Sequence, residues 1–598
     1  MCSLVHSDYL IVLGASVAEK LSTVKSLLNH HRLTKIIPAV LTIALLTLPA
    51  VLSHSIVPVF AVTSSATSTE QLVTDYSAVF VGQVNVATLP ASTEGIDTPL
   101  GLPDLSLATQ GQSGAADPSF AVVTPGSQSF IHIVKSFAGT PGTNPNPCRC
   151  SPPDMGLAAS SKFVVQMVNL AGTIWKNNGV KVTTFSLSDF WFLPVRGGPL
   201  GIGMSDPLVL YDAAADRFYA SIIDTFDVNR VNFAVTATND PTGAWFIYRV
   251  IANCNAATPY SNCSPSSSNT LPDQPYIGYS SDKFLITAND FDITTNAFLG
   301  SQYWILNKAE MLSGCTAPTS CPQGRNIDAK TNAIPNNNFA IRPAQHLSAT
   351  PTLTGDTTPT AYMVENCLTE VPPGILFNVC PTAPIPADPG GINVYTIHGT
   401  PPSPTSVMTT TVPIHRIAFA QRSDQPGNPA SLDTRGSGRI TSVVWRSNLL
   451  WTAFNDGPSS SGCSQPSCAR LDQISTIAPY MTLQDMDLTL PGTSVFYPAL
   501  STDTQNNLVV LYGSSSSTKF PDLEVVGQLS TMAPNTVSQA AVIVAGTAAD
   551  LSGRWGDYFW AATDPATPNT FWVSGEYRTV SLFQGWSTQV GEISFSTT

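Results

Sequence analysis

Short apolar segments separated by polar turns recur along the chain from residue 154 onward. In each repeat a polar residue opens a strand rich in β-branched or aromatic residues. A tight turn of Asp, Asn, Ser or Lys follows, and a second apolar strand then ends in polar residues. This pattern predicts antiparallel β-hairpins. Seven copies are found, at 154–169, 206–224, 273–290, 342–365, 439–456, 498–515 and 557–576.

Further strand-like segments fill the gaps between these hairpins, at 231–239, 245–251, 303–307 and 392–398. Repeated meanders of short strands are typical of β-propeller blades. The sequence therefore predicts an all-β fold, a seven-bladed β-propeller of antiparallel blades, with tandem β-sandwiches as the alternative. A strand at 127–137 is expected to complete the last sheet beside the C-terminal strand, because closing the ring removes exposed edges.

The N-terminal part differs from the repeats. Scattered basic residues precede an apolar run from Ile36 to Val62, which predicts for residues 1–61 a secretory signal cut after Ala61, or an uncleaved signal anchor. Residues 62–126 are rich in Ser, Thr, Pro and Gly and predict a flexible linker. The propeller is then expected to occupy residues 127–598.

The cysteines indicate the same compartment. Of eleven, all but Cys2 fall into close pairs in polar loops, which predicts local disulfides in an oxidising environment. No pair has the companion ligands of a zinc site. We therefore expect a secreted or cell-surface protein whose disulfides join Cys148 to Cys150, Cys254 to Cys263, Cys315 to Cys321, Cys367 to Cys380 and Cys463 to Cys468.

The chain contains few charged residues. Charged residues make up 11% of the chain, hydrophobic residues 43%, and the net charge is −13. Such a composition does not suit a disordered chain, and the absence of a Lys/Arg cluster argues against nucleic acid as a partner. Contact with a membrane is expected only through an uncleaved N-terminal segment.

The few charges recur at the starts of first strands and the ends of second strands. In antiparallel hairpins these two positions lie at the same end of the sheet, so we expect them to gather on one face around the central axis. A glycan or protein ligand is the expected partner of this face. The alternative is that such residues cap strands and hydrogen-bond neighbouring blades. The candidate ligand-binding residues are Asp154, Asp206, Asp273, Arg342, Arg439, Arg554, Asp557 and Glu576.

Two second-strand ends carry alternating carboxylates, Asp224 with Asp227 and Asp290 with Asp292. Oxygen ligands spaced in this way suit calcium, the one cofactor that the sequence suggests. The alternative is an Asx turn, in which each Asp caps its own backbone.

Catalytic motifs are scarce. The chain has no Gly-x-Ser-x-Gly elbow, His-Glu-x-x-His motif or phosphate-binding loop. The remaining possibility is glycoside hydrolysis by a pair of carboxylates on the predicted face. The candidates for catalytic roles are Asp206, Asp273, Glu576 and Tyr577.

Two hairpins, TDTQNNLVV at 502–510 and TDPATPNTFWV at 563–573, are similar to the Asp-box hairpin of sialidases, although Gln505 stands where that motif has Gly. The chain thus resembles secreted β-propellers, broadly sialidase- or BNR-like. Sialidases hold the substrate carboxylate with three arginines and use a Tyr/Glu nucleophile pair and an Asp acid/base. The positions that this resemblance nominates are Arg342, Arg439, Arg554, Glu576 with Tyr577, and Asp206.

Together these features predict a secreted or cell-surface propeller that binds a ligand on the face formed by the strand starts and the loops after the second strands. A glycoside hydrolase is the first alternative and a structural surface component the second.

Overall fold

The structure is a computed structural model. It describes residues 69–596 except for 72, 91–120, 144–149, 197–203, 225–228, 253–269, 296, 314–325, 336–338, 349–358, 369–379, 381–389, 435–437, 459–461 and 584. The predicted signal segment therefore lies outside the described residues. No described helix has the length and apolar character required to span a bilayer.

Strand pairing groups most described strands into antiparallel sets, which we call blades and number along the chain. In the first three, each strand pairs with the next. Blade 1 contains β5 (Gly156–Ala159), β6 (Phe163–Val168), β7 (Ala171–Lys176) and β8 (Lys181–Ser186); blade 2 contains β9 (Met204–Asp212), β10 (Arg217–Asp224), β11 (Arg230–Thr236) and β12 (Ala244–Ile251); blade 3 contains β13 (Thr270–Tyr279), β14 (Lys283–Asp292), β15 (Phe298–Asn307) and β16 (Asn326–Pro335).

The later blades follow the same meander. Blade 4 contains β17 (Arg342–Pro343), β19 (Ala361–Leu368), β20 (Gly390–His398) and β21 (Ser406–Ile414); blade 5 contains β24 (Ile440–Arg446), β25 (Leu449–Asp456), β26 (Cys468–Ser475) and β27 (Met481–Leu488); blade 6 contains β28 (Ser494–Thr502), β29 (Leu508–Ser516), β30 (Lys519–Gln528) and β31 (Ala541–Val544); blade 7 contains β32 (Trp560–Thr563), β33 (Thr570–Arg578) and β34 (Trp586–Phe595).

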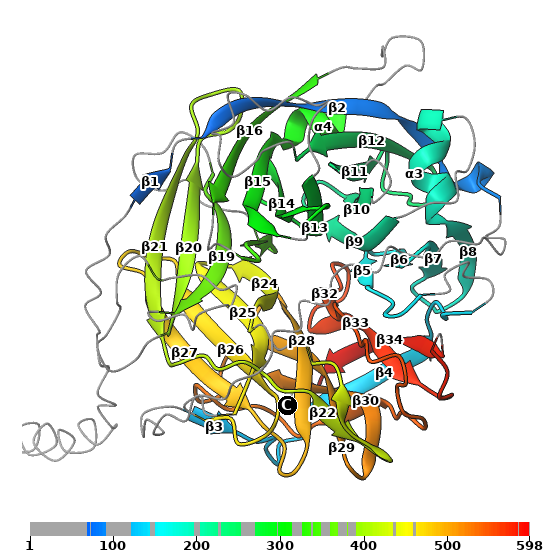
Figure 1. Cartoon of the computed structure of the whole chain (residues 1–598), viewed down its shortest axis with the longest axis vertical. Helices are drawn as coiled ribbons and strands as arrows, with labels where there is room; N and C mark the ends of the chain where they lie inside the picture. The colour runs from blue at the N-terminus through cyan, green and yellow to red at the C-terminus, as the bar shows by residue number, and fades with distance from the viewer. Residues whose placement is uncertain are drawn as a thin grey trace, which may run out of the picture. The chain divides into compact units, whose positions relative to one another are not determined.

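Figure 1 shows the blades arranged around a centre, with first strands such as β9, β13 and β24 toward the middle and last strands such as β8 and β16 toward the outside. This all-β propeller confirms the predicted fold class. The hydrogen-bonded sheets do not separate into one sheet per blade, because β18 (Gln345–His346) pairs in parallel with both β13 and β24, and the N-terminal strand β2 (Thr74–Asn85) pairs with both β12 and β16. The number of blades in the ring therefore stays a prediction.

N-terminal strands add to the outer edges of the blades. β1 (Thr69–Gln71) pairs with β21, β2 (Thr74–Asn85) pairs with both β12 and β16, and β3 (Ala121–Val123) pairs in parallel with β27. All three lie within the stretch interpreted as a linker, so part of that stretch contributes strands to the sheets. The boundaries proposed at 61 and 126 stay predictions.

The final blade is completed by an early strand. β4 (Ile131–Ala138) pairs antiparallel with β34 along its whole length. This pairing confirms that the segment at 127–137 completes the last sheet. It joins the two ends of the ring by backbone hydrogen bonds, so that β34 is not left as an exposed edge.

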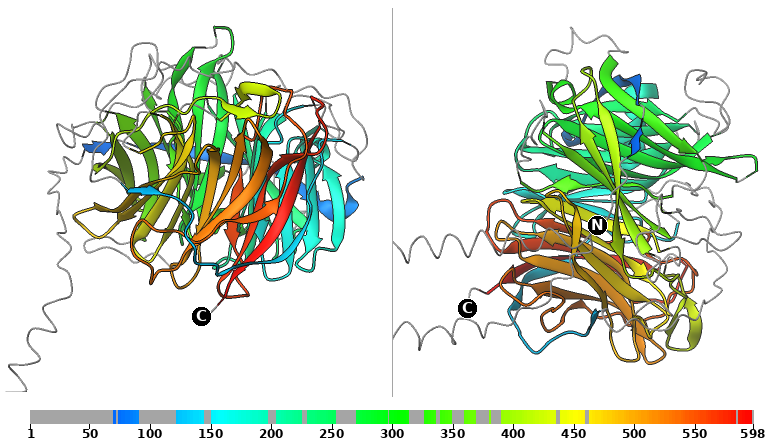
Figure 2. Two further views of the ribbon diagram at one scale, coloured as in Figure 1. Left: turned by 90° about the horizontal axis from the view of Figure 1, so that it is seen from below. Right: turned by 90° about the vertical axis from the view of Figure 1, so that its left-hand side faces the viewer.

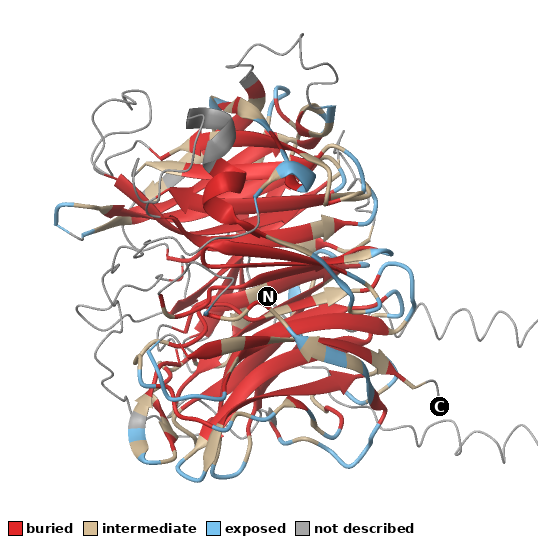
Figure 3. Cartoon of the chain, turned by 90° about the vertical axis from the view of Figure 1, so that its right-hand side faces the viewer, coloured by how far each residue is buried: buried red, intermediate tan, exposed pale blue. Residues whose placement is uncertain are grey.

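Apolar side chains pack between neighbouring blades, which stack face against face (Figure 2). Tyr219 from blade 2, for example, stacks on Phe284 from blade 3 with 5.0 Å between ring centroids. Figure 3 shows that buried residues dominate the strands, whereas exposed residues are concentrated in turns and outer segments. Strands buried on both faces explain why the chain is rich in apolar residues and poor in charge.

The remaining elements are small. Two helices, α3 (Leu187–Arg196) and α4 (Lys308–Ser313), and the 3₁₀ turn η1 (Val86–Thr88) occur among the described residues, together with a hairpin of β22 (Ser423–Gln425) and β23 (Asn428–Leu432). Two predicted disulfides are confirmed, Cys367–Cys380 and Cys463–Cys468. Cys150 is also disulfide-bonded. The other predicted cysteine positions, 148, 254, 263, 315 and 321, lie outside the described residues.

Candidate functional site

In five of the seven repeats a residue at or next to the opening position has a backbone role. Asp154, Asp206, Gln274, Tyr497 and Asp557 all have positive φ angles, between 43° and 58°. Register shifts accompany several of these positions, for example between Asp273 and Tyr276, and mark β-bulges in the first strands. Asp tolerates this left-handed conformation better than most residues, which explains its recurrence there. We call this end of the first strands the strand-start end.

Amide side chains at the ends of second strands fix the openings of the following blades. Asn289 Oδ1 of blade 3 accepts a hydrogen bond from the Ala340 backbone N–H at 2.9 Å, and Asn455 Oδ1 of blade 5 accepts one from the Tyr497 N–H at 2.7 Å. The Asn366 side chain donates to the carbonyl oxygen of Gly438 in the same way. These contacts match the alternative raised from the sequence, in which such residues join neighbouring blades.

The structure brings the predicted ligand-binding residues to the strand-start end, but it buries nearly all of them. Their exposed fractions do not exceed 7%, except for the Arg554 side chain at 26%. Asp206 accepts hydrogen bonds from Ser205 Oγ at 2.9 Å and Tyr558 Oη at 3.0 Å. Asp154 accepts one from Asn169 Nδ2 at 2.6 Å. A ligand role for this set stays a prediction; its burial and internal partners favour the strand-capping alternative.

Side chains from three blades meet near the axis at the strand-start end. The rings of Tyr276 in blade 3 and Tyr558 in blade 7 pack edge to face, with centroids 5.6 Å apart. The Arg342 guanidinium of blade 4 packs on Tyr276 and lies 5.6 Å from the Tyr558 ring. Arg439 donates to the side-chain oxygen of Gln274. Arg342 and Arg439 therefore contact residues of other blades.

The catalytic candidates on β33 point in different directions. Glu576 is fully buried, accepts a hydrogen bond from the Gly556 N–H at 2.8 Å, and lies 3.2 Å from Arg578. Burial raises the pKa of Glu576 to about 8. Tyr577 is partly exposed, and successive side chains of a strand face opposite sides of the sheet. Because Glu576 and Tyr577 face opposite sides, they do not share one pocket as a nucleophile pair would.

The predicted calcium ligands are also separated by environment. Asp224 and Asp290 are buried, and burial raises the pKa of Asp290 well above its usual value. Asp292 is partly exposed and accepts hydrogen bonds from the backbone N–H groups of Thr294 at 2.9 Å and Thr295 at 2.8 Å. Asp227 lies outside the described residues. Asp292 thus forms the Asx turn that was the alternative to an ion site.

A cavity of about 290 Å³ lies at the opposite end of the first strands. It is lined by the last residues of these strands and by the turns that follow them, and we call it the turn-end cavity. Five hairpins and the β18 segment contribute to it. Its lining includes Tyr211, Asp212 and Ala213 of blade 2, Tyr279 and Ser280 of blade 3, His346 of β18, Arg446 of blade 5, Asp503 of blade 6, and Asp564 of blade 7.

The carboxylates of this lining hold their own turns. Asp503 Oδ1 accepts hydrogen bonds from the N–H groups of Gln505 and Asn507, each at 2.9 Å. Asp564 Oδ1 accepts one from the Ala566 N–H at 2.8 Å, and its Oδ2 accepts one from Trp572 Nε1 at 3.1 Å. These are the two hairpins that resemble the Asp box, so the aspartates of the motif fix the turn conformation here.

Asp212 is neutralised within the fold. Its Oδ2 lies 2.5 Å from Lys308 Nζ at the start of α4, and both side chains are buried. The same ammonium donates to the carbonyl oxygen of Ser280 at 2.5 Å. Asp212 Oδ1 accepts a hydrogen bond from the Ala214 N–H at 2.9 Å. This pair ties the turns of blades 2 and 3 together at the cavity wall.

Aromatic and basic side chains supply the rest of the wall. Tyr279 Oη donates to the Tyr211 carbonyl oxygen at 2.9 Å. The His346 ring stacks on Trp445 with 4.9 Å between centroids, and burial lowers the pKa of His346 to about 3, so this imidazole is neutral. Arg446 is 8% exposed, and its Nη2 donates to the Thr502 carbonyl oxygen at 3.2 Å.

Sequence reasoning pointed to the strand-start end and did not predict the turn-end cavity. The turn-end residues carry no cluster of charge and no motif that indicates a cavity. The parallel bridge that brings His346 beside β13 and β24 has no signal in the repeat pattern either. The sequence contains one hint of this site. If all first strands begin at one end of the fold, they must also end together at the opposite end.

Comparison with known proteins adds little. No protein-family model matches the chain, and no curated protein matches it. Solved structures that resemble it include a phage phi92 endosialidase (8% identity, 65% of this chain and 67% of that one, TM-score 0.34) and a Trypanosoma rangeli sialidase complex (9%, 70% and 55%, TM-score 0.31). A polysaccharide lyase, an ulvan lyase, gives 8% identity over 77% of this chain and 95% of that one, with a TM-score of 0.35. With TM-scores this low, fold and function are argued from the strand pairing and the cavity alone.

Proposed function

We propose that this protein is a secreted or cell-surface β-propeller that binds a glycan in the turn-end cavity. The cavity itself carries the proposal, because six separate segments converge there on one hollow at the axis. A concave site with apolar walls and a few convergent polar groups is the usual form of a small-ligand site. The disulfides support an extracellular location.

The chemistry of the wall suits a sugar. Sugars present both apolar C–H faces and hydroxyl groups, and the wall combines the rings of Tyr211, Tyr279 and His346 with the guanidinium of Arg446. Neutral His346 adds a flat surface without charge. A preformed wall of this kind binds without ordering loops, which reduces the entropic cost of association.

Binding fits the cavity better than hydrolysis does. A glycosidase needs two carboxyl groups that face the scissile bond. The three aspartates of the lining, Asp212, Asp503 and Asp564, instead direct oxygens to backbone N–H groups of their own turns, and Asp212 is paired with Lys308. We therefore place the glycoside hydrolase second, as an activity that a panel of chromogenic glycosides would detect.

A glycan array probed with the protein lacking residues 1–61 identifies ligands, and titration calorimetry then measures their affinity. Ala213→Trp places an indole at the exposed rim of the cavity and is expected to abolish binding. Lys181→Trp, at an exposed position of β8, is the matched control and is expected to bind normally.

Two results would contradict the proposal. Binding that survives Ala213→Trp but is lost in Arg554→Ala would return the ligand site to the strand-start end. Failure of every glycan on the array to bind would remove the glycan function itself, and self-assembly without any ligand dependence would then support the structural alternative.

A further inference from the structure

Arg446 is a buried cation that forms no close ion pair with the residues described by the structure. It is 8% exposed and lines the turn-end cavity. Within the part of the chain that the structure describes, its contacts are one hydrogen bond, from Nη2 to the Thr502 carbonyl oxygen at 3.2 Å, and no ion pair; its buried Nε has no hydrogen-bond partner. Buried charges are normally paired, so an arginine in this state indicates a missing anion.

The nearby carboxylates do not fill this role. Asp503 is the carboxylate whose charge acts on Arg446, but its oxygens accept three hydrogen bonds within its own turn, from the N–H groups of Gln505 and Asn507 and from the Asn507 side chain. Asp564 is held in the same way, and Asp212 pairs with Lys308. The guanidinium therefore keeps donors for a group that enters the cavity.

The electrostatics of the wall agree with this geometry. Burial lowers the pKa of Arg446 from its ordinary value, the direction expected when a cation is desolvated without a close partner. Arg446 is still charged at neutral pH, because an arginine remains protonated in proteins. An oxyanion that reached it would be held by charge-assisted hydrogen bonds in a site shielded from water.

We propose that Arg446 forms an oxyanion subsite in the turn-end cavity, so that the glycan bound there is an acidic one that presents a carboxylate or a sulfate ester to the guanidinium. This inference rests on the proposed glycan-binding function. The subsite lies at the opposite end of the first strands from Arg342, Arg439 and Arg554, which the sialidase-like resemblance nominates. It depends on one arginine, not on three.

Matched ligands separate charge from shape. Titration calorimetry at pH 7 compares D-glucuronate with D-glucuronamide, which has the same shape without the charge, and D-glucose 6-sulfate with D-glucose. The charged member of at least one pair is expected to bind about tenfold or more tightly, as a charge-assisted hydrogen bond in a shielded site implies. The two pairs distinguish a carboxylate ligand from a sulfate ligand. Oligosaccharides that carry these charged and neutral sugars, displayed on an array, test longer ligands.

Variants assign the preference to Arg446. Arg446→Gln is expected to bring the charged and neutral members to equal affinity, and Arg446→Lys to retain part of the difference, because lysine keeps the charge but not the planar fork. Arg249→Gln is the matched control. This partly exposed arginine of β12 donates a hydrogen bond to Asn232 and is not part of the cavity lining. Thermal unfolding of each variant shows that it is folded.

The outcomes separate the two claims. If neutral glycans bind in the cavity and neither charged sugar binds more tightly, the oxyanion subsite is wrong while the glycan function stands. A charge preference that persists in Arg446→Gln overturns the assignment to this residue. If no glycan of either kind binds, both proposals fall.

Discussion

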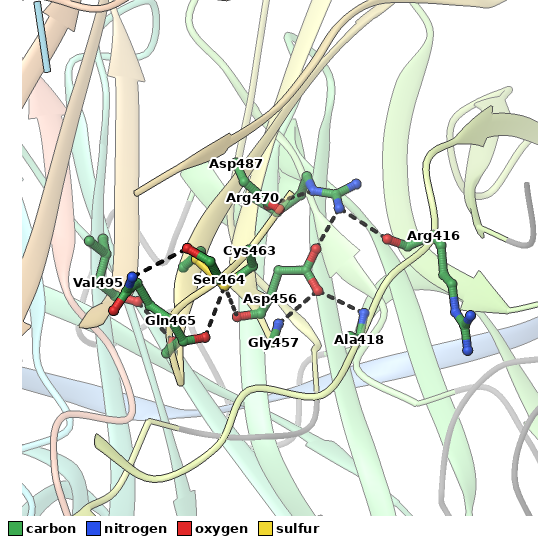
Figure 4. The surroundings of a disulfide bond; sticks show 12 residues. Arg416, Ala418, Asp456, Gly457, Cys463, Ser464, Gln465, Arg470, Asp487 and Val495 are labelled. Carbon is green, nitrogen blue, oxygen red and sulfur yellow. Dashed lines mark hydrogen bonds and ion pairs between the residues drawn. A yellow bond between two sulfur atoms is a disulfide. The ribbon is translucent and has the colours of Figure 1, made fainter. Parts of the chain in front are cut away.

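Blade 5 contains two buried arginines with opposite surroundings. Arg470 on β26 is fully buried and forms ion pairs with Asp456 at 2.5 Å, Asp485 at 3.0 Å and Asp487 at 2.9 Å, close to the disulfide of Cys463 (Figure 4). It also donates to two backbone carbonyl oxygens. Arg446 on β24 has one carbonyl contact and a cavity.

The difference shows how to tell a charged residue that stabilises the fold from one that serves function, in a chain that has few charged residues. A buried charge whose donors are all used holds the fold together, and its removal exposes its partners. A buried charge with unused donors beside a cavity costs free energy until a ligand arrives. By this criterion Arg470 is structural, whereas Arg446 keeps a buried nitrogen without a hydrogen-bond partner beside a cavity. Arg439 at the strand-start end also keeps such a nitrogen, but it does not line the cavity.

The largest expected effect is the difference in stability between variants of these two arginines. Arg470→Met leaves three buried carboxylates without their cation and is expected to lower the free energy of unfolding by about 3–5 kcal/mol. Arg446→Met removes an uncompensated cation and is expected to leave stability unchanged or raise it. Chemical denaturation of both variants at pH 7 measures the difference. Equal destabilisation by the two substitutions would break the comparison.

Buried carboxyl groups predict a pH dependence of the same sign for several sites. Burial raises the pKa of Glu576 to about 8, that of Asp522 to about 6, and that of Asp290 well above its usual value. Between about pH 4 and 8 the folded state therefore keeps protons that the unfolded chain has released, so stability falls as pH rises through this window. The pKa of Asp485, lowered to about 2, acts in the opposite sense below about pH 4, and that of His346, lowered to about 3, does so up to about pH 6.5.

Thermal unfolding between pH 5 and pH 8 tests this, with a lower melting temperature expected at pH 8. Glu576→Gln keeps an acceptor for the Gly556 N–H but cannot ionise, so the variant is expected to match the wild type at pH 5 and to be the more stable protein at pH 8. A melting temperature that rises steadily from pH 5 to pH 8 would show that these acids are ionised in the fold.

An intermediate effect is expected at the junction between blades 5 and 6. Asn455→Ala leaves the Tyr497 N–H and the Thr434 carbonyl oxygen without their partner and is expected to cost about 1–3 kcal/mol, with glycan binding unchanged. Asn455→Asp keeps the acceptor but loses the donor while the carboxyl group is ionised. Below about pH 4 an unperturbed Asp is protonated, so the substitution should destabilise the protein less there than at pH 7. Loss of ligand binding in a folded Asn455→Ala protein would show that the strand-start end influences binding in the turn-end cavity.

Much of the fold could be predicted because it depends on local pattern. The hairpin repeats at 206–224 and 439–456 correspond to β9–β10 and β24–β25, and β4 was expected beside β34. Alternating apolar residues and tight turns encode such pairings directly. The strands between 69 and 85 were missed, because they add to outer edges where exposed Ser and Thr side chains are tolerated.

The candidate site was harder to predict, because a sequence shows residue types and not their access to solvent. The strand-start charges lie at one end of the strands, but nothing in the sequence says that Asp206 and Glu576 are buried. Arg446 follows an ordinary apolar strand, and its isolation depends on Asp503 being saturated by its own turn. Hydrogen-bond accounting of this kind requires three-dimensional positions.

The smallest expected effect concerns the Asx turn of Asp292 at the strand-start end. Asp292→Asn keeps an oxygen that can accept from the Thr294 and Thr295 N–H groups, so the melting temperature should change by about 1 °C or less. Adding calcium to the wild type should then have no effect that the variant lacks, because the carboxylate is committed to its turn. A calcium-dependent rise in melting temperature that Asp292→Asn abolishes would show that this end holds an ion after all. That result would give the strand-start end a ligand of its own and remove the contrast between the two ends.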